Sequence, residues 1–118
     1  MAQAAIKQNG EAGAGPAIDR SHLSRMTFGD KALERELLEL FDRQAALLVA
    51  RMHGTESATV KALAHTLKGS AVGVGATEVA EAAAALEHAQ DPERLAAIIR
   101  AVERARITVA AMLAQPAN

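Results

Sequence analysis

The chain has 118 residues, which is the size of one domain with a single hydrophobic core. Its net charge of −1 argues against a broad electrostatic surface for nucleic acid, and its lack of cysteine excludes disulfides and thiolate zinc sites. Half of the residues are hydrophobic but only 2% are aromatic, and this alanine- and leucine-rich composition favours helices.

The N-terminal part of the chain predicts a tail followed by one short helix. Residues 1–15 are rich in Ala, Gly and Gln and show no apolar periodicity, so we expect a flexible tail. A helical domain is expected over residues 16–114. It begins with a short helix over about residues 17–25, in which Ile18 and Leu23 pack against the rest of the domain.

A long amphipathic helix is predicted next, from the residue after Asp30 to about Met52. The Asp30 side chain can accept hydrogen bonds from the first free amides of this helix, and Gly54 ends it. Apolar residues at helical spacing form its expected buried face: Leu33, Leu37, Leu40, Phe41, Leu48 and Met52.

Two further helices are predicted in the middle of the chain. Thr55-Glu56-Ser57 offers a start for a helix over about residues 57–74, and Gly73 and Gly75 weaken the helix near its end. The next helix covers about residues 76–89. Its expected buried face consists of Val79, Ala82, Ala83 and Leu86.

The last predicted helix begins at Asp91-Pro92, which combines a capping side chain with proline at the first helical position. The helix extends to about Ala114, and residues 115–118, which include Pro116, are expected to form a flexible C-terminus. Its inward-facing residues are expected to be Leu95, Ile98, Ile99, Val102, Val109 and Met112.

The order of these segments predicts an all-α fold, because no part of the chain alternates strictly between apolar and polar residues. Long amphipathic helices joined by short turns pack as antiparallel neighbours. We therefore expect an antiparallel up-down-up-down four-helix bundle with the short N-terminal helix across one end. Such a bundle can bury its apolar faces within one chain, so we expect a monomer.

The segment around His65 predicts a histidine on the exposed face of the helix over residues 57–74. When the helix is projected at about 100° per residue, its apolar residues gather on one side. These residues are Val60, Leu63, Ala64, Leu67 and Ala71. His65 lies roughly 150° from the centre of that stripe, so its ring is expected to point away from the bundle.

Two neighbours distinguish His65 from a solvated histidine without a chemical role, which is the alternative interpretation. Lys68 lies one helical turn further on, where its ammonium group can neutralise a phosphoryl group on the imidazole. Gly69 removes side-chain bulk beside the ring, although a mid-helix glycine costs about 1 kcal/mol relative to alanine. Clearance for a docking partner explains this glycine, and tight packing against a neighbouring helix is the alternative. Because a neutral imidazole nitrogen is nucleophilic near pH 7, His65 is a candidate phosphoryl acceptor.

The sequence His65-Thr66-Leu67-Lys68-Gly69-Ser70-Ala71, preceded by Ala64 and followed by Gly75-Ala76, resembles the signature of histidine-containing phosphotransfer (HPt) domains. The resemblance extends to Phe28-Gly29-Asp30, to residues 37–41 and to Leu86-Glu87, and it covers roughly residues 17–113. It implies that His65 is the phosphorylated histidine and that Lys68 interacts with the phosphoryl group.

The resemblance also implies roles for residues around the histidine. Gly69 matches the small residue that lets the partner approach, and Glu87 matches a position where Gln or Glu often hydrogen-bonds to the histidine. A solvated acid near a helix end is the alternative interpretation of Glu87. Val72-Gly73 departs from the family, which often has a polar residue there.

The function implied by the resemblance is that of a phosphocarrier between receiver-domain aspartates in a multistep two-component phosphorelay. Its partners would be receiver domains of a hybrid histidine kinase or of response regulators. The receiver would supply Mg²⁺, and this chain is expected to bind no cofactor. No carboxylate follows His65, since Thr66 stands there, which agrees with a carrier without kinase or phosphatase activity of its own. Ala58, Ala62 and Val72 flank His65 and are candidates for apolar contacts with the receiver, with partial burial as the alternative.

Two other function classes compete with the carrier. A histidine kinase fragment is disfavoured, because the chain has no room for an ATP-binding domain and no glycine-rich nucleotide motif. A phosphorylation-independent helical adaptor for protein–protein contacts remains the alternative.

The remaining histidines do not predict a second site. His22 is interpreted as a surface residue, His53 as a residue near a helix C-terminus, and His88 as part of a solvated helix end. No two histidines have the i, i+4 spacing of a helical zinc site, so we expect no metal. No stretch has the roughly 20 consecutive apolar residues of a membrane span, and the N-terminus lacks a signal peptide's apolar region, so a cytoplasmic protein is expected.

Overall fold

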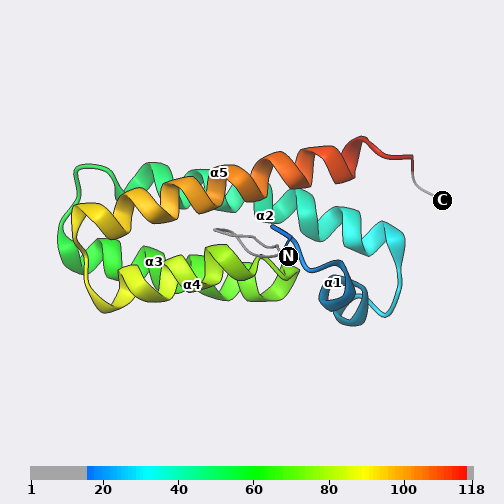
Figure 1. The fold of residues 1–118 in the computed structure, drawn as a ribbon, viewed down its shortest axis with the longest axis horizontal. Helices are drawn as coiled ribbons and strands as arrows, with labels where there is room; N and C mark the ends of the chain where they lie inside the picture. Colours follow the sequence, from blue (N-terminus) through cyan, green and yellow to red (C-terminus); the bar gives the residue numbers. More distant parts are fainter. Residues whose placement is uncertain (1–15, 117–118) are drawn as a thin grey trace, which may run out of the picture.

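The computed structural model describes residues 16–116, and all the regular secondary structure in this part of the chain is helical (Figure 1). The predicted tail, residues 1–15, and the last two residues lie outside the described residues. The five helices are α1 (Arg20–Met26), α2 (Lys31–Met52), α3 (Ser57–Val74), α4 (Thr77–His88) and α5 (Pro92–Ala114). The predicted helices match them closely, although α1 begins three residues later than expected and α4 is one residue shorter at each end.

Three aspartates determine where helices begin, because each side chain accepts a hydrogen bond from a free amide of the first turn. Asp19 accepts from the amide of His22 at 3.0 Å, Asp30 from that of Leu33 at 3.1 Å, and Asp91 from that of Arg94 at 2.8 Å. Pro92 follows Asp91 at the start of α5, as the sequence predicts. The late start of α1 follows from its cap, since the helix cannot extend before Asp19.

Helix α1 is joined to the end of α3 by backbone contacts. Gly75 ends α3 in the left-handed conformation with φ of 77°, and its carbonyl accepts a hydrogen bond from the Asp19 amide at 2.8 Å. A Cβ atom on Gly75 would lie 2.8 Å from the Asp19 carbonyl oxygen, so no larger residue fits without movement of the backbone. A second contact joins His22 Nε2 to the Val72 carbonyl at 2.8 Å.

The four long helices lie alongside one another in Figure 1, and α1 lies at one end of them. Helix α3 packs against α2 and α4, and α5 packs against the same two helices. The core between them contains the whole apolar stripe predicted for α3, and Ile18 and Leu23 from the α1 region are buried with it. None of the helices among residues 16–116 is long and apolar enough to cross a membrane.

The predicted buried face of α2 is wrong at two positions. Leu33 and Leu40 are 37% and 43% exposed, whereas Leu38 and Ala45, which were not predicted, are buried in the core. Leucines occupy adjacent positions 37 and 38 and again 47 and 48, so two overlapping stripes fit the helical period equally well. The packing of α2 against both α3 and α5 selects the stripe that contains Leu38, Phe41 and Ala45.

Candidate functional site

His65 projects from the face of α3 opposite the core, as the helical projection predicts. Its side chain is 68% exposed, whereas Ala64 and Leu67 on the same helix are fully buried. Helical periodicity produces this contrast, because residues 63, 64, 67 and 71 share one side of the helix and residue 65 lies on the other. The imidazole ring is therefore accessible to a second protein.

Glu87 on α4 contacts both His65 and Lys68 on α3. Its carboxylate lies with Oε2 at 2.7 Å from His65 Nδ1 and with Oε1 at 2.9 Å from Lys68 Nζ. The three predicted residues therefore form one cluster across α3 and α4. The Glu87 carboxylate lies between the His65 ring and the Lys68 ammonium group. The Glu87 side chain is 22% exposed, and both of its oxygens have a partner.

The charge of Glu87 follows from these two contacts. Hydrogen bonding from Lys68, and next from His65, lowers the pKa of the Glu87 carboxyl below its ordinary value of 4.5. The group is consequently ionised at neutral pH and can only accept hydrogen bonds.

An ionised Glu87 determines which nitrogen of His65 carries the proton. Because the carboxylate accepts, Nδ1 must donate, and a neutral ring then has its lone pair on Nε2. Nε2 is the ring nitrogen without a hydrogen-bond partner among the contacts of residues 16–116. The arrangement thus presents a nucleophilic nitrogen on an exposed ring.

Gly69 leaves open space beside the histidine. A Cβ atom built on this residue would meet nothing within 4 Å, so the alternative that Gly69 allows close packing of a neighbouring helix is wrong. Ala58, Ala62 and Val72 are also exposed on this side of α3, with Val72 at 54%. Small or apolar residues therefore flank the exposed ring on α3, while Glu87 and Lys68 lie on its charged side.

Comparison with protein families agrees with this geometry. The model of the Hpt domain family matches residues 31–115, which is more than half of the chain. The chain belongs to the Hpt domain family. Hpt domains carry out histidine phosphotransfer in two-component signalling, interact with receiver domains of kinases and response regulators, and are phosphocarriers rather than kinases or phosphatases. The searches of curated proteins and of solved structures gave no match.

The other histidines of this Hpt domain make no side-chain hydrogen bond or ion pair with His65, Lys68 or Glu87 among the contacts of residues 16–116. His53 is the residue that follows α2, and His88 is exposed at the end of α4. His22 is half-buried, and its contact with the Val72 carbonyl was not predicted, because a bond between residues 50 positions apart leaves no local signal. Within residues 16–116, no three His, Asp or Glu side chains gather closely enough to hold a metal ion.

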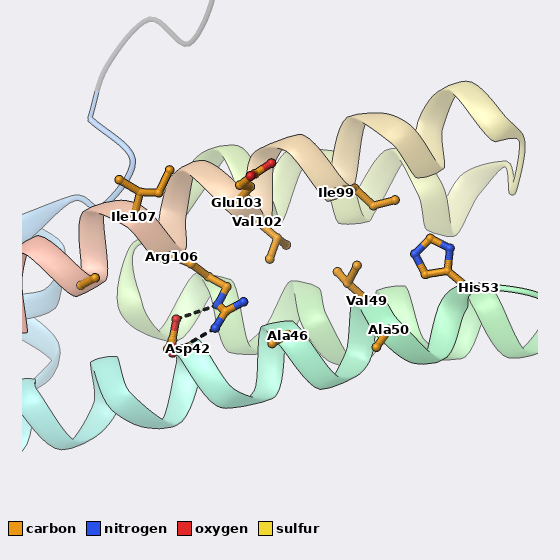
Figure 2. Close-up of a pocket in the computed structure, with 11 residues that line it drawn as sticks. Asp42, Ala46, Val49, Ala50, His53, Ile99, Val102, Glu103, Arg106 and Ile107 are labelled. Carbon is orange, nitrogen blue, oxygen red and sulfur yellow. Dashed lines mark hydrogen bonds and ion pairs between the residues drawn. The ribbon is translucent and has the colours of Figure 1, made fainter.

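A separate groove of the Hpt domain lies between α2 and α5 (Figure 2). Its walls are mostly apolar, with Val49 on α2 and Ile99 on α5 among them. Asp42 and Arg106 bridge the groove with a contact of 2.7 Å, and this carboxylate raises the pKa of the guanidinium. No residue of α3 or α4 lines the groove, so it is distinct from the His65 cluster.

Proposed function

We propose that this Hpt domain carries a phosphoryl group on His65 and relays it between aspartates of two receiver domains. The observation that carries this proposal is the hydrogen bond of 2.7 Å between His65 Nδ1 and Glu87 on an otherwise exposed ring. Because this hydrogen bond places the ring proton on Nδ1, it favours a nucleophilic Nε2. We include in the proposal an antiparallel up-down-up-down order of the four long helices and a monomeric state.

The proposed transfer step involves only the His65 ring, the aspartyl phosphate of the receiver and the Glu87 carboxylate. The Nε2 lone pair attacks the phosphorus of an aspartyl phosphate, the N–P bond forms, and the P–O bond to the aspartate breaks as its carboxylate leaves with the electron pair. The Nδ1 proton stays in place throughout. The ring becomes positively charged, and the Glu87 carboxylate stabilises this charge through the existing hydrogen bond. Delivery to the second receiver is the reverse reaction.

Lys68 contributes a positive charge that can move. Its ammonium group contacts Glu87 at 2.9 Å before transfer, and its side chain is 37% exposed. When His65 carries a phosphoryl group, Lys68 turns towards the phosphoryl oxygens, where a charge-assisted hydrogen bond is stronger than in a neutral pair. Glu87 then remains bonded to the ring.

The receiver supplies the rest of the chemistry. Mg²⁺ in its acidic pocket stabilises the charge of the transferring phosphoryl group, and this chain needs no cofactor of its own. The receiver docks on the surface of α3 around the ring, over Gly69, Ala58, Ala62 and Val72, all of which are exposed. No step requires ATP, and no carboxylate follows His65 to activate a water molecule, so we expect a carrier without kinase or phosphatase activity.

A transfer assay tests the proposal. The wild-type domain, His65→Gln and the matched control His88→Gln are incubated with a phosphorylated receiver and Mg²⁺. We expect acid-labile, alkali-stable label on the wild type and on His88→Gln but not on His65→Gln. Label on His65→Gln, or none on the wild type across a panel of receivers, would contradict the proposal. Binding to a receiver without any transfer would instead support an adaptor, and labelling by ATP alone would indicate a kinase.

A further inference from the structure

The carboxylate that contacts His65 lies on the last turn of a short helix. Helix α4 ends at His88, one residue after Glu87. The last four carbonyl groups of a helix have no partner within the helix, and final turns unwind more readily than the interior. The position of Glu87 therefore depends on what holds the end of α4.

Gln90 supplies that support. Its side-chain Nε2 donates to the Leu86 carbonyl at 2.9 Å and to the Glu87 carbonyl at 2.8 Å. Both amide hydrogens are used, and two of the carbonyl groups at the end of the helix are satisfied. One of these two carbonyls belongs to Glu87 itself, so the bond restrains the backbone from which the carboxylate extends.

The residues on both sides of Gln90 restrict its movement. Leu86 is fully buried in the core, and Asp91 is held by its hydrogen bond with the Arg94 amide at 2.8 Å. Gln90 is itself half-buried. Its side chain thus bridges two anchored segments, the end of α4 and the beginning of α5, and the geometry of the final turn is determined by more than helix propensity.

We propose that Gln90 is a positioning residue for phosphotransfer, which acts on His65 through the backbone of Glu87. The proposal rests on the proposed function of His65, and Gln90 touches neither the ring nor the phosphoryl group. Without the Gln90 hydrogen bonds the last turn of α4 opens more often, and Glu87 spends less time on Nδ1. The ring then more often carries its proton on Nε2, the nitrogen that must attack.

The test compares Gln90→Ala with Asp30→Ala, which removes a capping hydrogen bond at the start of α2 and no bond to Glu87. ¹⁵N NMR of His65 reports the tautomer, and hydrogen exchange reports opening of the last turn of α4. For Gln90→Ala we expect faster exchange at residues 86–89, more of the Nε2–H tautomer, and transfer about two- to tenfold slower. Asp30→Ala should show the wild-type tautomer and rate.

A second comparison separates positioning from general destabilisation. If Gln90 acts through Glu87, Gln90→Ala has no further effect on transfer when Glu87→Ala is already present. An unchanged tautomer in Gln90→Ala, or an equal loss of rate in both backgrounds, would overturn the inference. The NMR measurement needs no receiver. It therefore shows whether Gln90 affects the tautomer of His65 even if the wild-type domain accepts no phosphoryl group and the proposed function fails.

Discussion

At the scale of single residues, Glu87 connects two groups with different tasks. One oxygen contacts the ring of His65, and the other contacts Lys68, which in the proposed function turns towards the phosphoryl group. A carboxylate suits both tasks because its two oxygens can accept hydrogen bonds in different directions. The site is consequently sensitive to the charge of Glu87 as well as to its position.

The titration of Glu87 should reveal this connection. Its pKa lies below 4.5, foremost because Lys68 donates to it, so Lys68→Met should raise the midpoint towards that value. His65→Gln should raise it less, since the His65 hydrogen bond is the smaller cause. ¹³C NMR of the side-chain carboxyl measures both shifts. An unchanged midpoint in Lys68→Met would contradict the ion pair.

The lowered pKa of Glu87 also predicts how the free energy of unfolding changes with pH. A carboxyl with a lowered pKa in the folded state stabilises the fold at pH above its unfolded value, and this contribution disappears as the pH falls through the folded value. The free energy of unfolding should therefore decrease more steeply below pH 4.5 for the wild type than for Glu87→Gln. Urea denaturation at a series of pH values measures the difference.

Gly69 gives a prediction in which stability and function change in opposite directions. Alanine meets no atom within 4 Å there, and it favours a helix over glycine by about 1 kcal/mol, so Gly69→Ala should raise the free energy of unfolding by roughly that amount. The added methyl group reduces clearance beside His65 and should slow transfer. Gly73→Ala also meets open space and serves as the control, with increased stability and normal transfer.

At the scale of helices, the junction of α1 with α3 depends on one backbone conformation. Gly75→Ala places a methyl group 2.8 Å from the Asp19 carbonyl oxygen and imposes a left-handed conformation that costs roughly 1–2 kcal/mol for an L-residue. We expect the loss in the free energy of unfolding to exceed that range. Chemical denaturation measures it, and a loss below 1 kcal/mol would contradict the described contact.

The orientation of α2 can be tested with two leucines. Leu38 is 3% exposed and Leu40 is 43% exposed. Leu38→Ala should cost about 2–5 kcal/mol in the free energy of unfolding, whereas Leu40→Ala should cost less than about 1 kcal/mol. Equal losses would mean that the helix presents a different side to the core.

The sequence predicted the boundaries of α2, α3 and α5 because they depend on local signals such as Asp30, Asp91-Pro92 and Gly75. It predicted the outward face of α3 because a single apolar stripe is present there. The inward face of α2 was ambiguous, because its leucines form two overlapping stripes and only the neighbouring helices distinguish them.

The site shows the same division between local and long-range information. Lys68 and Gly69 lie within four residues of His65 and follow from helical spacing, whereas Glu87 required the family resemblance. The contacts of Gln90 with the end of α4 and of His22 with Val72 were not predicted. The partners of Gln90 lie only three and four residues earlier, but a glutamine after a helix end has several possible partners, and the sequence pattern specifies none of them.

At the scale of the whole molecule, the residues that stabilise the bundle differ from those on the surface around His65. The core residues of all five helices, together with Ile18, are almost fully buried, while the surface around His65 consists of small or flexible side chains. The groove between α2 and α5 lies on helices that contribute nothing to the His65 cluster. Substitutions on the His65 surface should therefore alter recognition with little change in the fold.

The single exposed nitrogen of His65 has a kinetic consequence. In the proposed relay, donor and acceptor receivers both need access to Nε2, so they cannot occupy the site together, and we expect a ping-pong scheme. A receiver whose phosphorylatable aspartate is replaced by alanine should inhibit competitively with respect to the acceptor. Initial-rate measurements at several concentrations of both receivers should give parallel double-reciprocal lines, and intersecting lines would indicate a ternary complex. The direction of phosphoryl flow then depends on the relative amounts and affinities of the competing receivers.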